Sequence, residues 1–169
     1  AGTPFRYISP VNEPQWDWSA KFGQMNQEGS PWHNKDIYKI ATTLDSVLFS
    51  KKMSTQMLIT EAGDLHSLYE GQSRSGRQIQ DFYNPGSQLF VGNLKTMHKV
   101  IEGHSYFTEA TDSNMISVRK KVLDTAAKYK VPFWQSEYCM LSNGYKDGKK
   151  GKIDQMDCAL FLAKVIYHD

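Results

Sequence analysis

Two kinds of apolar pattern alternate along this chain of 169 residues. The short apolar runs typical of β-strands are residues 4–14, 55–64, 100–110 and 131–140. Most of these runs are followed, after a polar stretch, by apolar residues at helical spacing. Strands that alternate with helices pair in parallel, and the helices cover the sheet. The pattern therefore predicts a one-domain α/β fold in which parallel strands alternate with helices.

The helical spacing marks three helices. The first follows Asn34, which we expect to act as its N-cap. Its apolar positions are Ile37, Ile40, Ala41, Leu44, Val47 and Leu48. The other two helices carry Met115, Val118, Val122 and Ala126, and then Ile153, Met156, Leu160 and Ala163. Residues 65–93 are polar and rich in turn-forming residues, so we expect a loop with short helical pieces there.

Composition excludes several classes of function. The net charge is only +2, so no nucleic-acid partner is expected. No apolar run approaches the roughly 20 residues of a membrane span. The histidine spacings match no metal motif and no glycine-rich phosphate loop occurs, so we expect neither a metal nor a cofactor. We expect Cys139 and Cys158 to be free, mostly buried thiols. Because Ala1 leads directly into a predicted strand, we expect no signal peptide in the chain.

Polar or aromatic side chains end each of the four predicted strands. These strand-end residues are Asn12 and Glu13, then Glu61, then His104 and Tyr106, and finally Gln135 and Glu137. In parallel α/β folds, the carboxyl ends of the strands lie at one edge, and the loops there hold the chemistry. We therefore expect these side chains to share one functional rim.

Glu13 and Glu137 are the two carboxylates that we expect to face each other across this rim. Such a pair can cleave a glycosidic bond, because one group protonates the leaving oxygen while the other attacks or activates water. Trp16 and Trp18 would favour the protonated acid by excluding water. The candidate hydrogen-bond donors that would keep the second carboxylate ionised are His104, Tyr106 and Gln135.

Several of these residues also have interpretations without function. A single Glu is usually a solvated or ion-paired surface group, and Trp134, inside a strand, suits the core. Glu61 would contact a substrate or pair with a basic neighbour. Asp17 would structure its loop or reach a sugar hydroxyl. Ser136 lacks the G-x-S-x-G segment of a serine nucleophile.

Four segments resemble retaining glycoside hydrolases of clan A, above all those of family 30. The segments are SPVNEPQW (9–16), NQEGSPW (26–32), EGHSYF (102–107) and FWQSEYCM (133–140). The resemblance implies that Glu13 is the acid/base, that Glu137 is the nucleophile and that Asn12 contacts the sugar. The residues expected to bind substrate are Asn12, Trp16, Trp18, Glu61, His104, Tyr106 and Tyr138.

The resemblance also implies the extent of the fold. Enzymes of this clan contain a (β/α)8 TIM barrel, and members of family 30 usually add a β-sandwich. Residues 1–169 would then form a C-terminal-half portion of a barrel catalytic domain, a partial TIM barrel with strands four to seven and the helices that follow them. The rest of the barrel would lie outside the chain.

The leading hypothesis is a retaining glycoside hydrolase that cleaves β-linked glycans by double displacement. The WQSEY segment resembles the β-1,6-galactanase-like branch of family 30, which implies a β-1,6-galactan substrate. The alternative is a non-catalytic carbohydrate-binding barrel or an inactive fragment, and we expect little turnover from the chain alone. By resemblance, the partner is an oligo- or polysaccharide and the protein is secreted or periplasmic. Retention predicts carboxyl groups about 5–5.5 Å apart.

Overall fold

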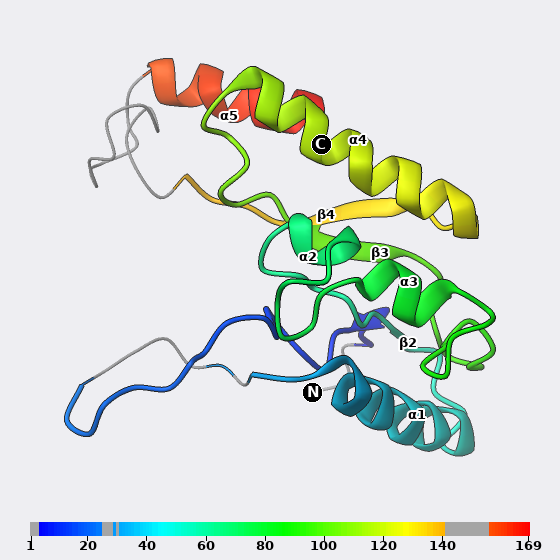
Figure 1. Ribbon diagram of the computed structural model, residues 1–169. Helices are drawn as coiled ribbons and strands as arrows, with labels where there is room; N and C mark the ends of the chain where they lie inside the picture. Colours follow the sequence, from blue (N-terminus) through cyan, green and yellow to red (C-terminus); the bar gives the residue numbers. More distant parts are fainter. Residues whose placement is uncertain (1–3, 25–28, 30, 141–155) are drawn as a thin grey trace.

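A computed structural model describes residues 4–24, 29, 31–140 and 156–169. Its elements are β1 (Tyr7–Ile8), α1 (Asn34–Ser50), β2 (Gln56–Met57), α2 (His66–Tyr69), α3 (Gln78–Tyr83), β3 (Ile101–His104), α4 (Asp112–Tyr129), β4 (Phe133–Glu137) and α5 (Met156–His168). The alternation of strands and helices is the mixed α/β order that the sequence predicts (Figure 1). The predicted helix position Ile153 lies outside the described residues.

The strands form one row in chain order. β1 pairs in parallel with β2, with Tyr7 opposite Gln56, and β3 pairs in parallel with β4. A parallel bridge between Ala62 and Gly103 joins the two pairs, because the His104 N–H donates to the Ala62 carbonyl at 2.8 Å. The expectation of parallel strands is therefore confirmed.

The row of strands is curved. β1 and β4 stand at its two ends, yet the rings of Tyr7 and Trp134 lie 5.6 Å apart, edge to face. His98 sits between them, 4.7 Å from the Tyr7 ring and 5.0 Å from the Trp134 ring. Side chains from the two outermost strands can meet in this way only across a concave face. Trp134 is still 40% exposed, so it belongs to the core only in part.

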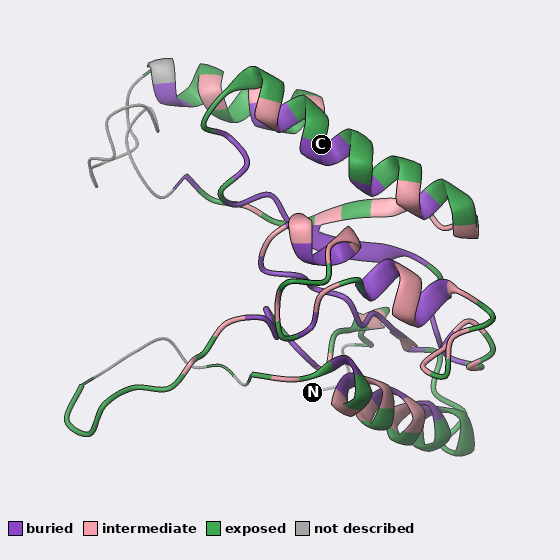
Figure 2. Ribbon diagram, viewed as in Figure 1, coloured by how far each residue is buried: buried purple, intermediate pink, exposed green. Residues whose placement is uncertain are grey.

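The helices cover the outer side of this row. α1 contacts α3, α2 and α3 contact α4, and α4 contacts α5 (Figure 1). The predicted positions Val47 in α1 and Met156 and Leu160 in α5 are exposed, so they do not face the core. The buried faces of α1 and α4 carry the other predicted positions, such as Ile37 and Ala41 in α1 and Val118 and Val122 in α4. Figure 2 shows that these buried faces point towards the strands. The helical spacing thus identified the core side of both long helices.

The first strand is much shorter than predicted. The apolar run 4–14 contributes only Tyr7–Ile8 to the sheet. Pro10 has no N–H to donate to a neighbouring strand, and residues 11–13 turn away towards the rim. The shortening leaves Glu13 in a loop rather than in a strand.

The predicted cap of α1 is wrong. His33 takes the N-cap position, and Asn34 is the first helical residue and is buried. The Asn34 side-chain amide instead donates to the Gly76 carbonyl at 2.8 Å and to the Asp81 carboxylate at 2.7 Å. Asn34 therefore ties α1 to the start of α3, since two tertiary acceptors replace the local one.

Cys139 and Cys158 are not joined in a disulfide, as predicted. Cys158 is buried in α5, whereas Cys139, just after β4, is exposed. The expected burial is therefore wrong for Cys139, which follows β4, the last strand of the row among the described residues.

Candidate active site

Four of the predicted residues gather at the carboxyl ends of the strands. Glu13 follows β1 and Glu61 follows β2, while His104 and Glu137 are the last residues of β3 and β4. Because the strands run in parallel, these ends lie at one edge of the row. A carboxylate oxygen of Glu13, a ring nitrogen of His104 and a carboxylate oxygen of Glu137 all lie within 4.8 Å of one another.

His104 is the centre of this group. Its Nδ1 lies 2.7 Å from the Glu13 Oε1 and 3.9 Å from the Glu137 Oε1, and its Nε2 lies 3.5 Å from the Glu61 Oε2. Burial alone would lower the pKa of His104, but the hydrogen bonds with Glu13 and Glu61 and the charges of Glu137 and Glu13 raise it to about 9. At neutral pH the ring is therefore an imidazolium that donates from both nitrogens.

Glu61 lies beneath His104 in a set of hydrogen-bond donors. The Ser9 hydroxyl donates to its Oε1 at 2.5 Å, and the Ser136 hydroxyl donates to its Oε2 at 2.6 Å. Burial would raise the pKa of Glu61, but the hydrogen bonds from His104, Ser136 and Ser9 lower it below its usual value. Glu61 is therefore an ionised carboxylate, although it is only 9% exposed. Its negative charge stabilises the protonated form of His104.

Glu137 is the more accessible of the two facing carboxylates. Its side chain is 51% exposed, whereas that of Glu13 is 9% exposed. The Tyr106 hydroxyl donates to the Glu137 Oε1 at 3.0 Å. Burial, followed by the hydrogen bonds with Cys139 and Glu137, raises the pKa of Tyr106 well above its usual value. The phenol therefore keeps its proton and remains a donor to Glu137.

The backbone holds Glu13 and Glu61 against each other. The Glu13 N–H donates to the Glu61 carbonyl at 2.9 Å. Both residues have positive φ angles, 43° for Glu13 and 32° for Glu61, which are uncommon for residues other than glycine. Strained conformations of this kind concentrate at functional sites, where the surrounding structure fixes them.

Two tryptophans pack against glycines beside this site. A Cβ on Gly63 would come within 2.2 Å of the Trp16 Nε1, and a Cβ on Gly29 within 2.4 Å of the Trp18 ring. The Trp18 Nε1 donates to the Glu13 carbonyl at 3.2 Å. Only glycine allows the two indoles to lie this close to the backbone. Trp16 and Trp18 are thus held in fixed positions on the loop that carries Glu13.

The other sequence candidates take different places. Asn12 is exposed next to Glu13, and the Tyr138 ring lies 5.6 Å from the Tyr106 ring. Gln135 lines a separate hollow of about 480 Å³ with Tyr138 and three residues of α5 or just after it. Asp17 accepts the backbone N–H of Ser19 at 3.1 Å, which fits its loop-structuring interpretation.

Sequence reasoning missed the hydroxyl partners of Glu61. Ser9 lies 52 positions before Glu61, and Ser136 lies 75 positions after it. The only signal was alternation, because Ser9 shares a strand face with Tyr7 and Ser136 shares one with Trp134. Phe107, which meets the Trp16 ring edge to face at 6.0 Å, was missed as well.

The group of Glu13, His104 and Glu137 also has the residue types of a metal site. A histidine binds a metal only through a nitrogen lone pair. Both ring nitrogens of His104 already have carboxylate partners, Glu13 at 2.7 Å and Glu61 at 3.5 Å. The described geometry is therefore that of an ion-paired cluster.

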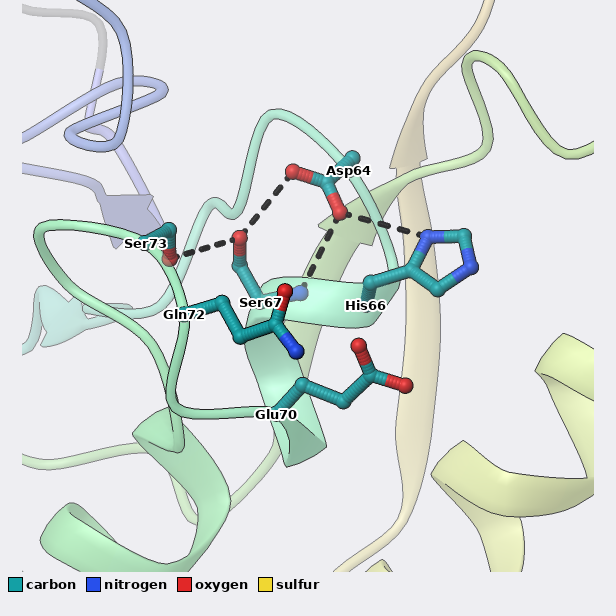
Figure 3. A pocket seen from close by; sticks show the side chains of 6 residues that line it. All are labelled: Asp64, His66, Ser67, Glu70, Gln72 and Ser73. Carbon is teal, nitrogen blue, oxygen red and sulfur yellow. Dashed lines mark hydrogen bonds and ion pairs between the residues drawn. The ribbon is translucent and has the colours of Figure 1, made fainter.

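A second cluster of polar side chains follows β2 (Figure 3). Asp64 accepts the Ser67 backbone N–H at 3.2 Å and the Ser67 hydroxyl at 3.0 Å, and its Oδ1 lies 3.5 Å from the His66 Nδ1. These side chains, with Glu70, Gln72 and Ser73, border a hollow of about 300 Å³. Because Asp64 satisfies the first turn of α2, this cluster organises the loop.

Glycoside hydrolases cleave their substrates with two facing carboxyl groups, and in barrel enzymes such groups lie at the carboxyl ends of parallel strands. The chain belongs to O-glycosyl hydrolase family 30, whose family model matches residues 1–169. The family resemblance of the sequence segments is therefore confirmed.

The chain is also similar to a conserved exported protein from Bacteroides fragilis, known from its crystal structure. The two share 25% sequence identity with a TM-score of 0.83, over 97% of this chain and 34% of that chain. The chain thus spans about a third of the length of that protein. No curated protein matches the chain. Within the described residues, no helix is both long enough and apolar enough to cross a membrane.

Proposed function

We propose that this chain carries the catalytic centre of a glycosidase that cleaves β-linked glycans with retention of configuration. The observation that carries the proposal is the approach of carboxylate oxygens of Glu13 and Glu137 to within 4.8 Å. Retaining enzymes place the two carboxyl groups about 5–5.5 Å apart, whereas inverting enzymes leave about 6.5–9.5 Å for a water molecule. The separation here supports the retaining class.

In the first step, the exposed Glu137 attacks the anomeric carbon. The bond from that carbon to the leaving oxygen breaks, and the Glu13 proton moves to the leaving oxygen. Glu13 becomes a carboxylate as the step proceeds. The His104 imidazolium, 2.7 Å from its Oε1, stabilises the new negative charge. The Tyr106 hydroxyl orients the Glu137 oxygen that it contacts.

In the second step, water hydrolyses the glycosyl-enzyme. Glu13 takes a proton from the water, the water oxygen bonds to the anomeric carbon, and the bond between that carbon and Glu137 breaks. In this step the imidazolium favours the ionised form of Glu13, which is the form that accepts a proton. Glu61 acts on this step through His104, because Ser9 and Ser136 occupy its two oxygens.

We propose that residues 1–169 are strands four to seven, with the following helices, of a (β/α)8 barrel. The parallel row in chain order and the contact of Tyr7 with Trp134 across its concave face support this assignment. The coverage of 34% of a structurally similar chain also supports it. The remaining strands would close the barrel beyond β1 and β4, beside Glu137.

For the substrate we propose a β-linked oligo- or polysaccharide, with β-1,6-galactan favoured by the WQSEY segment around Glu137. Asn12, Trp16, Trp18 and Tyr138 would contact the sugar. Membership of a glycosidase family supports a carbohydrate partner. Because the similar Bacteroides fragilis protein is an exported one, we propose that this protein is exported as well.

Proton NMR of the first product formed tests the proposal. The intact protein is mixed with a β-linked substrate, and the anomeric signals are followed before mutarotation equilibrates them. We expect the β-anomer first. An α-anomer first would replace double displacement with inversion, and binding without any product would favour a non-catalytic carbohydrate-binding barrel.

A further inference from the structure

A further pocket, distinct from the two hollows described above, lies at the opposite end of the strands from Glu13 and Glu137. It has a volume of about 400 Å³. Its walls come from the end of α3 and the loop after it, from the segment just before β3, and from the end of α4 with the two residues that follow. The lining residues are Tyr83, Pro85, Phe90, Gly92, Lys99, Lys128, Tyr129, Lys130 and Val131. In Figure 1, the end of α4 and the loop after α3 lie at the edge of the molecule away from the end of β4. The length of β3 therefore separates this pocket from the candidate active site.

The charge of this pocket is of one sign. Among the residues that the structure describes, its lining holds three ionised side chains, Lys99, Lys128 and Lys130, and no carboxylate. Within the described part of the chain, none of these lysines forms an ion pair, although Lys39, Lys120 and Lys164 elsewhere do. All three lysines are exposed at the edge of the hollow, and their shared positive charge favours an anion there.

Aromatic rings form the rest of the pocket. The Tyr83 hydroxyl donates to the Val100 carbonyl at 2.5 Å, which fixes that ring beneath the pocket. Phe90 and Tyr129 are half-buried, so each leaves part of a ring accessible. A Cβ on Gly92 would come within 2.5 Å of the Phe90 ring, so glycine allows the ring to lie against the backbone. Rings of this kind suit the CH face of a sugar.

We propose that this pocket binds an anionic sugar unit, carrying a carboxylate or sulfate group, of a polysaccharide chain. The lysines would take the anionic group, and Phe90 and Tyr129 would contact the ring. The choice of a sugar rests on the proposed glycosidase function, whereas the anionic class rests on the lysines alone. The site would hold a substrate chain to the protein without taking part in cleavage.

Lysines near the end of a helix have another explanation, because they complement the helix dipole. The chain offers a matched control for this effect. Lys51 and Lys52 follow the end of α1, and Lys52 has a φ of 52°, close to the 57° of Lys130. Lys35, in the first turn of α1, is exposed as well. Changing these three lysines to glutamine removes as much positive charge as changing the three pocket lysines. Lys35, Lys51 and Lys52 line no part of the pocket.

The test is isothermal titration calorimetry of the intact protein with polygalacturonate, dextran sulfate and neutral dextran. We expect one or both anionic polymers to bind and neutral dextran to bind at least tenfold more weakly. The triple variant K99Q/K128Q/K130Q should weaken anionic binding by about tenfold, while K35Q/K51Q/K52Q changes it by less than about twofold. Equal losses in the two triple variants, or no anionic binding by the wild type, would overturn the proposal.

Further measurements separate loss of binding from misfolding, and sugar binding from anion binding. If the triple variant does not fold by circular dichroism, K99Q alone is titrated, and unchanged affinity then contradicts the proposal. Phe90→Leu should weaken polymer binding severalfold but leave the binding of inorganic sulfate unchanged, and equal effects on both would remove the sugar from the proposal. Hydrolysis of a small neutral aryl glycoside should be the same in every pocket variant, so failure of the glycosidase assignment would be visible separately.

Discussion

The His104 Nδ1 and the Glu13 Oε1 lie 2.7 Å apart, and both side chains are buried. On its other side, the His104 ring faces Glu61, whose two oxygens are held by serine hydroxyls. The imidazolium is therefore fixed between two carboxylates, and one of them, Glu13, has an oxygen within 4.8 Å of a Glu137 oxygen. This order separates a supporting acid, Glu61, from a reacting one, Glu13.

Removing the proposed nucleophile should stop turnover while binding persists. We expect Glu137→Gln to lower kcat by roughly 10³-fold or more, because the amide cannot form the glycosyl-enzyme. The substrate dissociation constant should stay within about threefold, since the side chain keeps its size. Steady-state kinetics and calorimetry measure the two quantities. Glu70→Gln, in the loop after α2, is the control, and wild-type turnover in Glu137→Gln would exclude the nucleophile role.

The charge of His104 should set the alkaline limit of activity. Its pKa of about 9 means that activity falls as pH rises through that value, because the imidazolium loses its proton. Glu61→Gln removes one of the groups that raise this pKa, so the alkaline limb of kcat/KM should move to lower pH. The Asp64→Asn variant loses the partner of a different histidine, His66, and should leave the profile unchanged. Identical alkaline limbs in wild type and Glu61→Gln would contradict the role given to Glu61.

Tyr106 should matter through its hydroxyl alone. Tyr106→Phe removes the donor that lies 3.0 Å from the Glu137 Oε1 and keeps the ring. We expect kcat to fall by about 10- to 100-fold, since a hydrogen bond to a charged group contributes roughly 1.5–3 kcal/mol. Tyr167→Phe, at an exposed tyrosine of α5, is the matched control. A kcat within twofold of wild type would show that Tyr106 does not orient Glu137.

The stability of the fold should decrease from mildly acidic to alkaline pH. Burial raises the pKa of Glu102 to about 8, so the folded protein holds a proton that the unfolded chain loses above about 4.5. Stability from this group therefore declines as pH rises from about 4.5 to 8, and His104 adds a decline from about 6.5 to 9. We expect Tm to fall by roughly 5–10 °C between pH 5 and 9.

Glu102→Gln should flatten the first part of this decline. Glutamine keeps an oxygen for the Thr60 hydroxyl, which donates to Glu102 at 2.5 Å, and has no proton to lose. Differential scanning fluorimetry from pH 4.5 to 9 measures the effect, with Glu70→Gln as the control. A wild-type Tm that rises with pH over this range would have the wrong sign for a buried, protonated Glu102.

The order of elements and the rim could be predicted from the sequence because both depend on local patterns. Ile37 and Ala41 mark the core face of α1 by spacing alone, and Glu13 and Glu137 stand out because each ends an apolar run. Parallel pairing then places strand ends together whatever the details of each strand.

Features that depend on register and tertiary contact could not be predicted. The hydrogen bonds of Ser9 and Ser136 to Glu61 need the pairing of three strands to be known. Asn34 satisfies the sequence rule for a cap, yet two acceptors from the region of α3 bind its amide. The positive φ angles of Glu13 and Glu61 could not be predicted either, because glutamate rarely adopts such angles.

The most direct test of the central claim, that Glu13 and Glu137 act as a facing acid and nucleophile, is covalent trapping. The intact protein is incubated with an activated 2-deoxy-2-fluoro glycoside of its substrate sugar, and its peptides are mapped by mass spectrometry. We predict one added sugar per active site, carried by Glu137, and slower labelling in Glu13→Gln when the leaving group needs a proton. A sugar attached to another residue, or turnover of natural substrate with no covalent species at all, would contradict the account.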